Sequence, residues 1–443
     1  MKTTFRLLMF VAAAAAMSAP ASAQGQVTFT KDVAPILQAK CETCHHPGTV
    51  APMSLMTYQQ VRPYAKSIKQ NVSARDMPPW FIDKNVGIQH FDDDESLSDQ
   101  QIATIIKWVD DGALEGNPAD MPPQPQFADN NAWVIGKPDV IITLPKDVIV
   151  KARGSDWWPD VTVDPGLTED RYIQAVQIIP TKGYNDIHHI RTSMVRPGDQ
   201  GNNSGGTDQP EDLAEQGVWL SEYAIGKTAD VFNEGAGRFI KAGTKINFQM
   251  HLHPNGKTET PVNVIMGLKF YPKGYTPEHA VNTISVGSST VDLRPGEADA
   301  RDDGYLTLKQ AARILSIQPH MHDRGKALCM EAIYPTGKRE TLSCMRFQFN
   351  WMRNYVYNAD SAPLLPAGTI IHTIMWHDNS AQNKFNPDPD AQITWGSRTV
   401  DEMGHAYLNM YYMTDDEFKK EMDARKAKQS TLTSTLAPEQ QQR

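Results

Sequence analysis

The chain has 443 residues and a net charge of −9, from 43 Lys+Arg and 52 Asp+Glu. This length exceeds one ordinary domain and predicts a multidomain protein. No basic block is present, so nucleic-acid binding by phosphate neutralisation is not expected. Four cysteines are too few for a disulfide scaffold, and the 13 His and 19 Met are where soft metal chemistry is expected.

Residues 1–23 have the pattern of a secretory signal peptide. Lys2 and Arg6 give a positive start, residues 7–17 are apolar but too few to span a membrane, and Ala21-Ser-Ala23 fits a cleavage site. A periplasmic or secreted location is therefore predicted. No later run of about 18 apolar residues follows, so no membrane span is expected.

Cys41-Glu-Thr-Cys44-His45 has the C-x-x-C-H spacing of a covalent c-type haem site. Two thiols at this spacing add to the vinyl groups of one haem, and the adjacent histidine becomes an axial iron ligand. The alternative is a zinc or thioredoxin-like C-x-x-C. Zinc would need two more ligands nearby and a thioredoxin-like site a βαβ context, and neither is seen.

Helical patterns flank this motif. Apolar residues at helical spacing precede Cys41, and Ser98-x-x-Gln101 is a capping box before a second apolar series that Gly112 can end. This order resembles a class I cytochrome c, which implies a small all-α domain over residues 24–120.

The same resemblance implies a soft sixth iron ligand in the intervening loop. Met77, which opens Met-Pro-Pro-Trp80, matches that loop, whereas Met53 and Met56 are expected to pack in the core. Residues 121–134 are then predicted to be a stiff, proline-rich linker.

From about residue 131 the pattern changes to short runs rich in Val, Ile, Tyr and Thr, separated by turn residues. This favours antiparallel β-sandwich structure over α/β structure. No nucleotide-binding glycine motif is present. Residues 416–443 are predicted to form a charged, helix-like stretch and then a disordered tail.

Histidines in this part occur in three clusters, His188-His189, His251-x-His253 and His320-x-His322. In a strand, residues i and i+2 face one side, so each H-x-H can aim two imidazoles at one ion. Adjacent His188 and His189 can share an ion only if the backbone departs from an ideal strand. One pair alone would be an ordinary surface feature, but three clusters favour a metal site.

The motif Glu402-Met403-Gly-His-Ala-Tyr407, together with Pro-His320-Met-His322-x-x-Gly-Lys, resembles the copper type II monooxygenases. These include peptidylglycine alpha-hydroxylating monooxygenase and dopamine beta-monooxygenase, and bacterial cytochrome-fused relatives are most similar. The resemblance spans about residues 135–413. It implies two antiparallel, jelly-roll-like β-sandwich domains, residues 135–285 and 286–415, with two copper ions facing each other across a solvent cleft.

The resemblance also implies the ligands. An electron-passing copper would be held by the following residues: His188, His189 and His251. An oxygen-binding copper would be held by His320, His322 and Met403, with Tyr407 near it; these are the expected catalytic residues. A thioether ligand favours copper(I).

The chain departs from the family pattern in three respects. Gln318 stands where the peptide-processing enzyme has an arginine for the substrate carboxylate, so a peptide C-terminus is not favoured. Gly404 replaces a cysteine of a family disulfide. His253 and His405 have no family role and are interpreted as hydrogen-bonding or surface residues, and the remaining histidines as structural.

A different disulfide is predicted from a hairpin. If Tyr334 faces Arg339 across the turn Tyr334-Pro-Thr-Gly-Lys-Arg339, then Cys329 faces Cys344 on the paired strands.

The sequence thus predicts an exported copper-dependent monooxygenase that hydroxylates a C–H bond of a small organic substrate with O2. Electrons would come from a periplasmic donor through the fused haem. The alternative is a non-catalytic periplasmic electron-transfer or copper-binding cytochrome. A haem peroxidase would need an open iron site, which Met77 as sixth ligand opposes.

Overall fold

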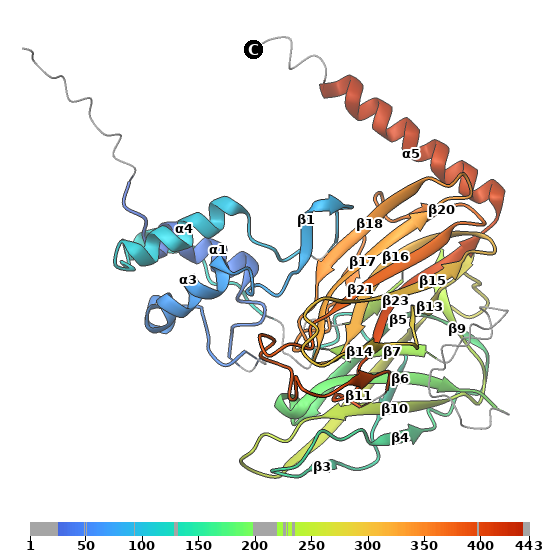
Figure 1. Cartoon of the computed structure of the whole chain (residues 1–443), viewed down its shortest axis with the longest axis horizontal. Coiled ribbons are helices and arrows are strands. Elements are labelled where there is room, and N and C mark those ends of the chain that lie inside the picture. The colour runs from blue at the N-terminus through green and yellow to red at the C-terminus, as the bar shows by residue number, and fades with distance from the viewer. Residues whose placement is uncertain are drawn as a thin grey trace, which may run out of the picture.

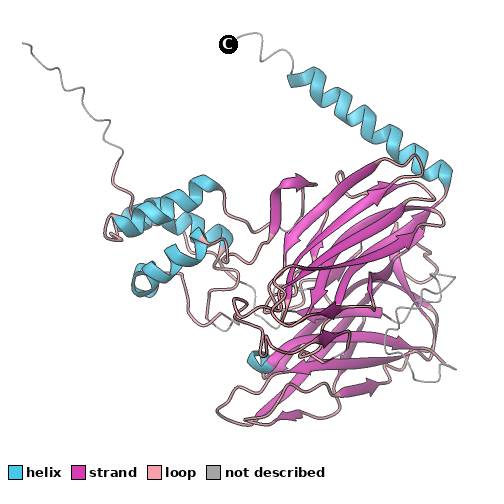
Figure 2. Ribbon diagram, viewed as in Figure 1, coloured by secondary structure: helices cyan, strands magenta, loops and turns pink. Residues whose placement is uncertain are grey.

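The computed structural model describes residues 25–47, 49, 51–92, 94–127, 132–197, 219–224, 227, 229–232, 235–396 and 398–436. The predicted signal peptide and the last residues of the predicted tail lie outside these ranges. Helices gather at the N-terminal end, and antiparallel strands make up most of the remainder (Figures 1 and 2). The predicted predominance of antiparallel β structure is confirmed.

Four short α-helices pack around one apolar core near the N-terminus. They are α1 (Ala34–Lys40), α2 (Tyr58–Val61), α3 (Ala65–Ser73) and α4 (Asp99–Asp110), with a π-turn at Phe29–Val33 and 3-10 turns at Arg62–Tyr64 and Pro118–Asp120. Phe29, Leu37, Ile105 and Trp108 are buried at the centre of this core. The capping box before α4 is present, because Ser98 and Gln101 each accept the other's backbone N–H.

A strand interrupts this helical segment, which was expected to be all-α. β1 (Ile82–Gly87) pairs antiparallel with β18 (Arg339–Arg346), and Figure 1 shows it at the edge of the C-terminal sheet. Gly87 has φ +66°, and a Cβ there would lie 2.3 Å from the Leu342 carbonyl oxygen, so only glycine fits. A partner strand more than 250 residues away in sequence left no local signal for β1.

The first β half contains two sheets that share one core. One sheet has the order β4 (Asp160–Val163), β10 (Lys245–Leu252), β6 (Ile187–Val195) and β7 (Trp219–Ala224). The other has the order β12 (His279–Ala280), β9 (Ala236–Ile240), β5 (Arg171–Lys182), β11 (Thr260–Phe270) and β2 (Val140–Thr143), with β3 (Val148–Val150) on β11 and β8 (Ala229–Val231) on β5.

The second β half also has two sheets around a shared core. One has the order β1, β18, β17 (Gly325–Ile333), β21 (Ile370–His377) and β15 (Ala300–Thr307). The other has the order β13 (Asn282–Ser288), β23 (Gly404–Met413), β16 (Ala311–Met321) and β19 (Tyr355–Val356), with β20 (Leu364–Leu365) on β16 and a separate pair of β14 (Asp292–Leu293) and β22 (Ile393–Thr394). Because β13 pairs with β23, the second half begins by Asn282, earlier than the predicted residue 286.

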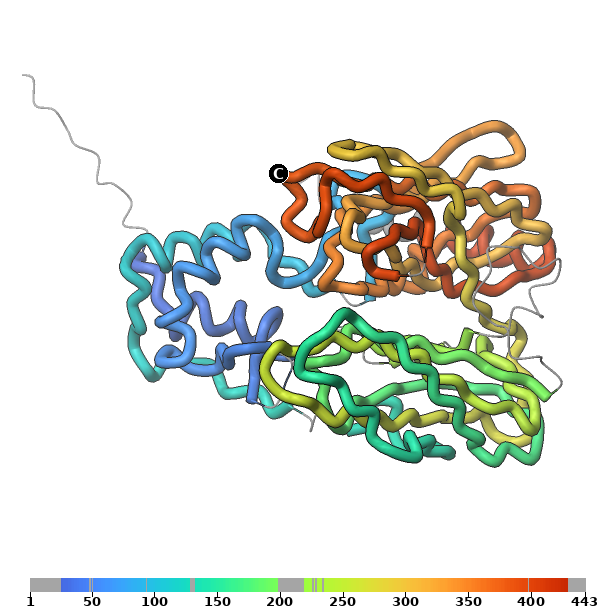
Figure 3. The backbone as a smooth tube through the Cα atoms, turned by 60° about the horizontal axis from the view of Figure 1, so that its bottom comes forward, coloured from blue at the N-terminus to red at the C-terminus, as the bar shows by residue number. Residues whose placement is uncertain are grey.

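A buried arginine joins the two β halves. Arg238 of β9 donates to the Thr283 hydroxyl at 2.8 Å and to the Asn409 side-chain oxygen at 3.3 Å, on strands of the second half. Burial lowers the pKa of Arg238 to about 10, which still leaves it charged at neutral pH. Figure 3 shows the two halves side by side, with the N-terminal helices at one end of both.

The predicted disulfide between Cys329 and Cys344 is confirmed. The register that suggested it was wrong next to the turn, where Arg339 faces Ile333 instead of Tyr334. An irregularity between Met330 and Glu331 shifts the pairing by one residue and places the cysteines opposite each other.

We expect Cys329 and Cys344 of the wild-type protein to resist thiol reagents after the protein is unfolded without reductant. A Cys329→Ser/Cys344→Ser variant should unfold at a lower temperature in a thermal melt. Closing this loop, with a sequence separation of 15, is worth about 3 kcal/mol. Labelling of Cys329 in the unreduced, unfolded protein would contradict the pairing.

The chain ends in α5 (Asp415–Leu436), which covers most of the predicted charged tail. Among the described residues, no helix is long and apolar enough to cross a membrane.

Candidate metal centre

Three histidines on two neighbouring strands converge. In the pairing of β6 with β10, His189 faces His251 and Ile187 faces Leu252, so His188 is an extra, bulged residue. This bulge is the departure from an ideal strand that adjacent histidines need in order to face one point. Potential ligand atoms of His188, His189 and His251 all lie within 4.8 Å of one another.

The outer ring nitrogens of two of these histidines are engaged. His188 Nε2 lies 3.0 Å from the Phe349 carbonyl oxygen, and His251 Nε2 lies 2.7 Å from Asp156 Oδ2. Because a carbonyl and a carboxylate only accept, each histidine carries its proton on Nε2, which leaves the Nδ1 lone pair for a metal. Such outer partners are usual around metal-bound histidines.

The inner geometry and the charge state suit a metal ion. The Nδ1 atoms of His188 and His189 lie 3.1 Å apart. Two nitrogens bound at about 2.0–2.1 Å to one tetrahedral ion would lie about 3.3 Å apart. Burial, followed by the charge of His251, lowers the pKa of His188 to about 4 and that of His189 well below its usual value. Both imidazoles are therefore neutral at pH 7, the form that binds metals.

Asp156 connects this cluster to His253, because its two carboxylate oxygens contact His251 and His253. Burial would raise the pKa of Asp156, but hydrogen bonds from His251 and His253 hold it at about 2. His253 is exposed on the outer side of the carboxylate, with Nδ1 2.7 Å from Asp156 Oδ1.

We expect Asp156→Asn to weaken copper binding at the three-histidine cluster by about 10–100-fold, because His251 loses the carboxylate that fixes its tautomer. Copper titration of the purified variant measures this effect. His253→Ala is the matched control, since it removes a contact to the same carboxylate but leaves His251 in place. Equal affinities in Asp156→Asn and wild type would show that the carboxylate does not act through His251.

The second predicted pair lies at the end of β16. The rings of His320 and His322 have centroids 5.4 Å apart. His322 Nδ1 lies 3.2 Å from the Asp401 carbonyl oxygen, which leaves Nε2 as its available lone pair. Within the described chain, His320 Nδ1 is buried without a hydrogen-bond partner. Burial lowers the pKa of His322 to about 4 and that of His320 well below its usual value.

The register of β16 with β23 brings the sequence around Met403 to this pair. His320 faces His405 and Met321 faces Gly404, so His322 and Met403 follow the last paired residues of the two strands. The buried Glu402 side chain links the backbones of His322 and Met403. Its Oε1 accepts the N–H of His322 at 2.5 Å and that of Met403 at 2.9 Å. Burial raises the pKa of Glu402 to about 8, against the opposing effect of these N–H donors.

Tyr407 and Gln318 also lie at this pair. They face each other across the strands, and the Tyr407 ring has its centroid 5.4 Å from that of His320. Burial raises the pKa of Tyr407 to about 12, so its phenol is protonated at neutral pH. Gln318 donates its side-chain amide to the buried Glu222 carboxylate. The Gln318 side chain is therefore held in an internal hydrogen bond.

The two histidine clusters are close neighbours. The ring centroids of His189 and His320 are 6.2 Å apart, although the residues lie on different β halves and 131 positions apart in the chain. The resemblance had implied a separation by a solvent cleft. The structure instead has these two rings adjacent.

Sequence reasoning did not single out a buried histidine, His377, that lies close to Gly404 and Glu402. His377 is fully buried, and neither ring nitrogen has a hydrogen-bond partner among the described residues. Its Nε2 would lie 3.4 Å from a Cβ added at Gly404, beside Asp302 Oδ2 at the same distance. Sequence reasoning also left His405 without a role, because its position opposite His320 follows only from the register of β16 with β23.

The C-x-x-C-H motif follows α1, with Cys41 as the C-cap of that helix. His45 Nδ1 lies 2.9 Å from the Met53 carbonyl oxygen, so Nε2 is left for an axial bond, and both thiols are free. Burial raises the pKa of Cys41 to about 12. The described residues therefore fit a covalent haem at its proximal side.

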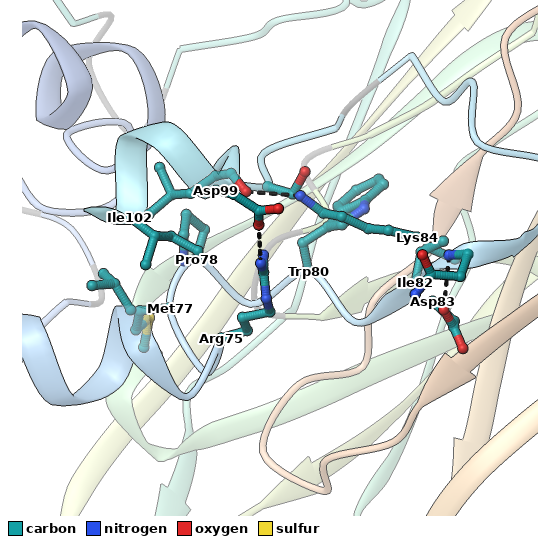
Figure 4. A pocket seen from close by; sticks show the side chains of 13 residues that line it. Arg75, Met77, Pro78, Trp80, Ile82, Asp83, Lys84, Asp99 and Ile102 are labelled. Atoms are coloured by element: carbon teal, nitrogen blue, oxygen red, sulfur yellow. Dashed lines mark hydrogen bonds and ion pairs between the residues drawn. The ribbon is translucent and has the colours of Figure 1, made fainter. Parts of the chain in front are cut away.

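Met77 borders a cavity of about 290 Å³. Figure 4 shows its side chain beside Pro78 and Ile102, with the Arg75–Asp99 ion pair at the same cavity. The residues that line this cavity do not include Cys41, Cys44 or His45. The cavity therefore does not connect Met77 with the C-x-x-C-H motif.

Comparisons with known proteins leave the function open. No protein-family model and no curated protein matches the chain. The major capsid protein P2 of bacteriophage PM2 is similar at a TM-score of 0.29 and 9% identity, covering 61% of this chain and 96% of that one. An allantoicase has a TM-score of 0.16 and 11% identity, covering 49% and 77%. Bacillus subtilis oxalate decarboxylase has a TM-score of 0.14 and 6% identity, covering 66% and 80%. Likenesses this weak carry no argument.

Proposed function

We propose that the chain is an exported, copper-dependent monooxygenase in which a class I cytochrome c domain is fused to two copper-binding β-sandwich domains. The observation that carries the proposal is the convergence of His188, His189 and His251, with the His320/His322 pair directly beside them. A C-x-x-C-H motif in the same chain adds a one-electron carrier.

The residues present suit the proposed groups. Three imidazoles would hold one copper, and two imidazoles with the Met403 thioether would hold the other, a donor set that favours the cuprous state. Cys41, Cys44 and His45 would hold the haem. When bound, copper would supply the one-electron and oxygen chemistry needed to hydroxylate a C–H bond.

The chain itself would orient these ligands. The Phe349 carbonyl and Asp156 hold the protons of His188 and His251 on Nε2. The Asp401 carbonyl oxygen holds the proton of His322 on Nδ1, which leaves the Nε2 lone pair of His322 available. Glu402 sets the spacing between the His322 and Met403 backbones. Tyr407 remains a neutral phenol beside His320 and can donate a hydrogen bond there.

Copper content per haem tests the proposal. The full-length protein, matured with haem, reconstituted with copper and desalted, is expected to retain about two copper ions per haem. It should then consume O2 in a screen of small organic substrates under reducing conditions. One copper per haem would instead favour the non-catalytic electron-transfer or copper-binding cytochrome. Zero copper would overturn the monooxygenase and leave a cytochrome attached to a β-sandwich.

A further inference from the structure

One loop of the second β half contacts both the three-histidine cluster and the helical segment that carries the C-x-x-C-H motif. Residues 347–354 leave β18 and lead to β19. Near the start of this loop, Phe349 accepts the His188 hydrogen bond at 3.0 Å and stacks on the same ring, with centroids 4.7 Å apart and planes at 20°.

The other end of the loop contacts the helical segment. Arg353 is buried and pairs with Glu95 at 3.1 Å, and its guanidinium lies 5.6 Å from the ring centroid of Trp80. Trp80 closes the Met-Pro-Pro-Trp sequence. Glu95 follows Asp94, whose carbonyl oxygen accepts a hydrogen bond from Lys40 Nζ at 2.8 Å, and Lys40 directly precedes Cys41.

We propose that the loop from Phe349 to Arg353 is the built-in route by which an electron passes from the haem to the copper at His188, His189 and His251. This inference rests on the proposed function. Ferrous haem would give up one electron and become ferric, and cupric copper would become cuprous; no bond breaks and no proton has to move. Electron transfer slows steeply across gaps between atoms. The route would cross the ion pair of Glu95 with Arg353, follow covalent bonds to Phe349, and reach His188 through the hydrogen bond and the stacked ring. A fused donor also acts at high effective concentration.

The test uses the full-length protein with haem and copper(II), oxidised and free of O2. A laser flash with a flavin sensitiser delivers an electron to the haem, and the decay of ferrous-haem absorbance is followed at several protein concentrations. Loss of the copper(II) EPR signal reports arrival. In the wild type, we expect a decay whose rate does not depend on protein concentration.

Two variants each remove one side-chain contact, one at each end of the route, while the backbone and the Phe349 carbonyl stay in place. Phe349→Leu removes the ring that stacks on His188 but keeps apolar bulk. Arg353→Gln removes the charge that pairs with Glu95. Each is expected to slow the decay severalfold while haem absorbance and copper content stay unchanged. Arg346→Gln is the matched control, because Arg346 also binds the helical segment, at Asp76, but makes no contact with His188.

Each outcome is decisive. Wild-type decay rates in both route variants, or an equal slowing in Arg346→Gln, would overturn the route. A wild-type protein without a copper(II) signal would instead overturn the proposed function, and the route with it.

Discussion

Met403→Leu is expected to abolish substrate-dependent O2 consumption while the haem spectrum and the melting temperature stay close to wild type. Removing an outer partner of a metal ligand costs about 10–100-fold, so removing a ligand should cost at least about 100-fold. Leucine conserves side-chain volume, so the loss would report the thioether and not the packing. O2 uptake with saturating substrate and reductant measures the effect.

Met410→Leu provides the matched control. Met410 lies on the same strand, β23, and is buried in the core of the second β half, away from the His320/His322 pair in the strand register. Its activity should remain at the wild-type level. Retained turnover in Met403→Leu would remove Met403 from the set of proposed ligands.

The second large effect is expected for Glu402→Ala. This carboxylate accepts three buried backbone N–H groups, those of His322, Arg324 and Met403. Each buried donor left without a partner costs about 1–3 kcal/mol, so the variant should lose at least about 3 kcal/mol. A loss of this size corresponds to a melting temperature lower by about 6–12 °C for a unit of 150–250 residues.

Thermal unfolding followed by near-UV circular dichroism measures this loss. Glu402→Gln retains one acceptor oxygen and should lose less. Glu340→Ala is the surface control, because Glu340 makes an exposed ion pair with Lys338, and such pairs are worth about 0–1 kcal/mol. A Glu402→Ala protein as stable as the Glu340→Ala protein would show that water satisfies the three donors.

Several features could be predicted from the sequence because their causes are local. The capping box of Ser98 and Gln101 forms within four residues, and short runs rich in Val, Ile, Tyr and Thr between turn residues indicate antiparallel sheets. The Cys329–Cys344 pairing followed from one hairpin, although the irregularity in its register was not visible.

The candidate site could be predicted only as a set of residues. The i, i+2 spacing of His320 and His322 places both rings on one side of a strand, and this depends only on the backbone repeat. The bulge at His188 is different, because it arises from the pairing of β6 with β10, whose residues are about 60 positions apart.

The C-x-x-C-H spacing, the closely spaced histidines and the strand-rich character of the chain were visible in the sequence, since each depends on chemistry or periodicity within a few residues. Only the tertiary structure decided that His189 lies beside His320, that the Phe349 carbonyl fixes His188, and that β1 extends the C-terminal sheet. These contacts join segments that are 131 to more than 250 residues apart. They are set by the packing of whole sheets, and no local pattern encodes that packing.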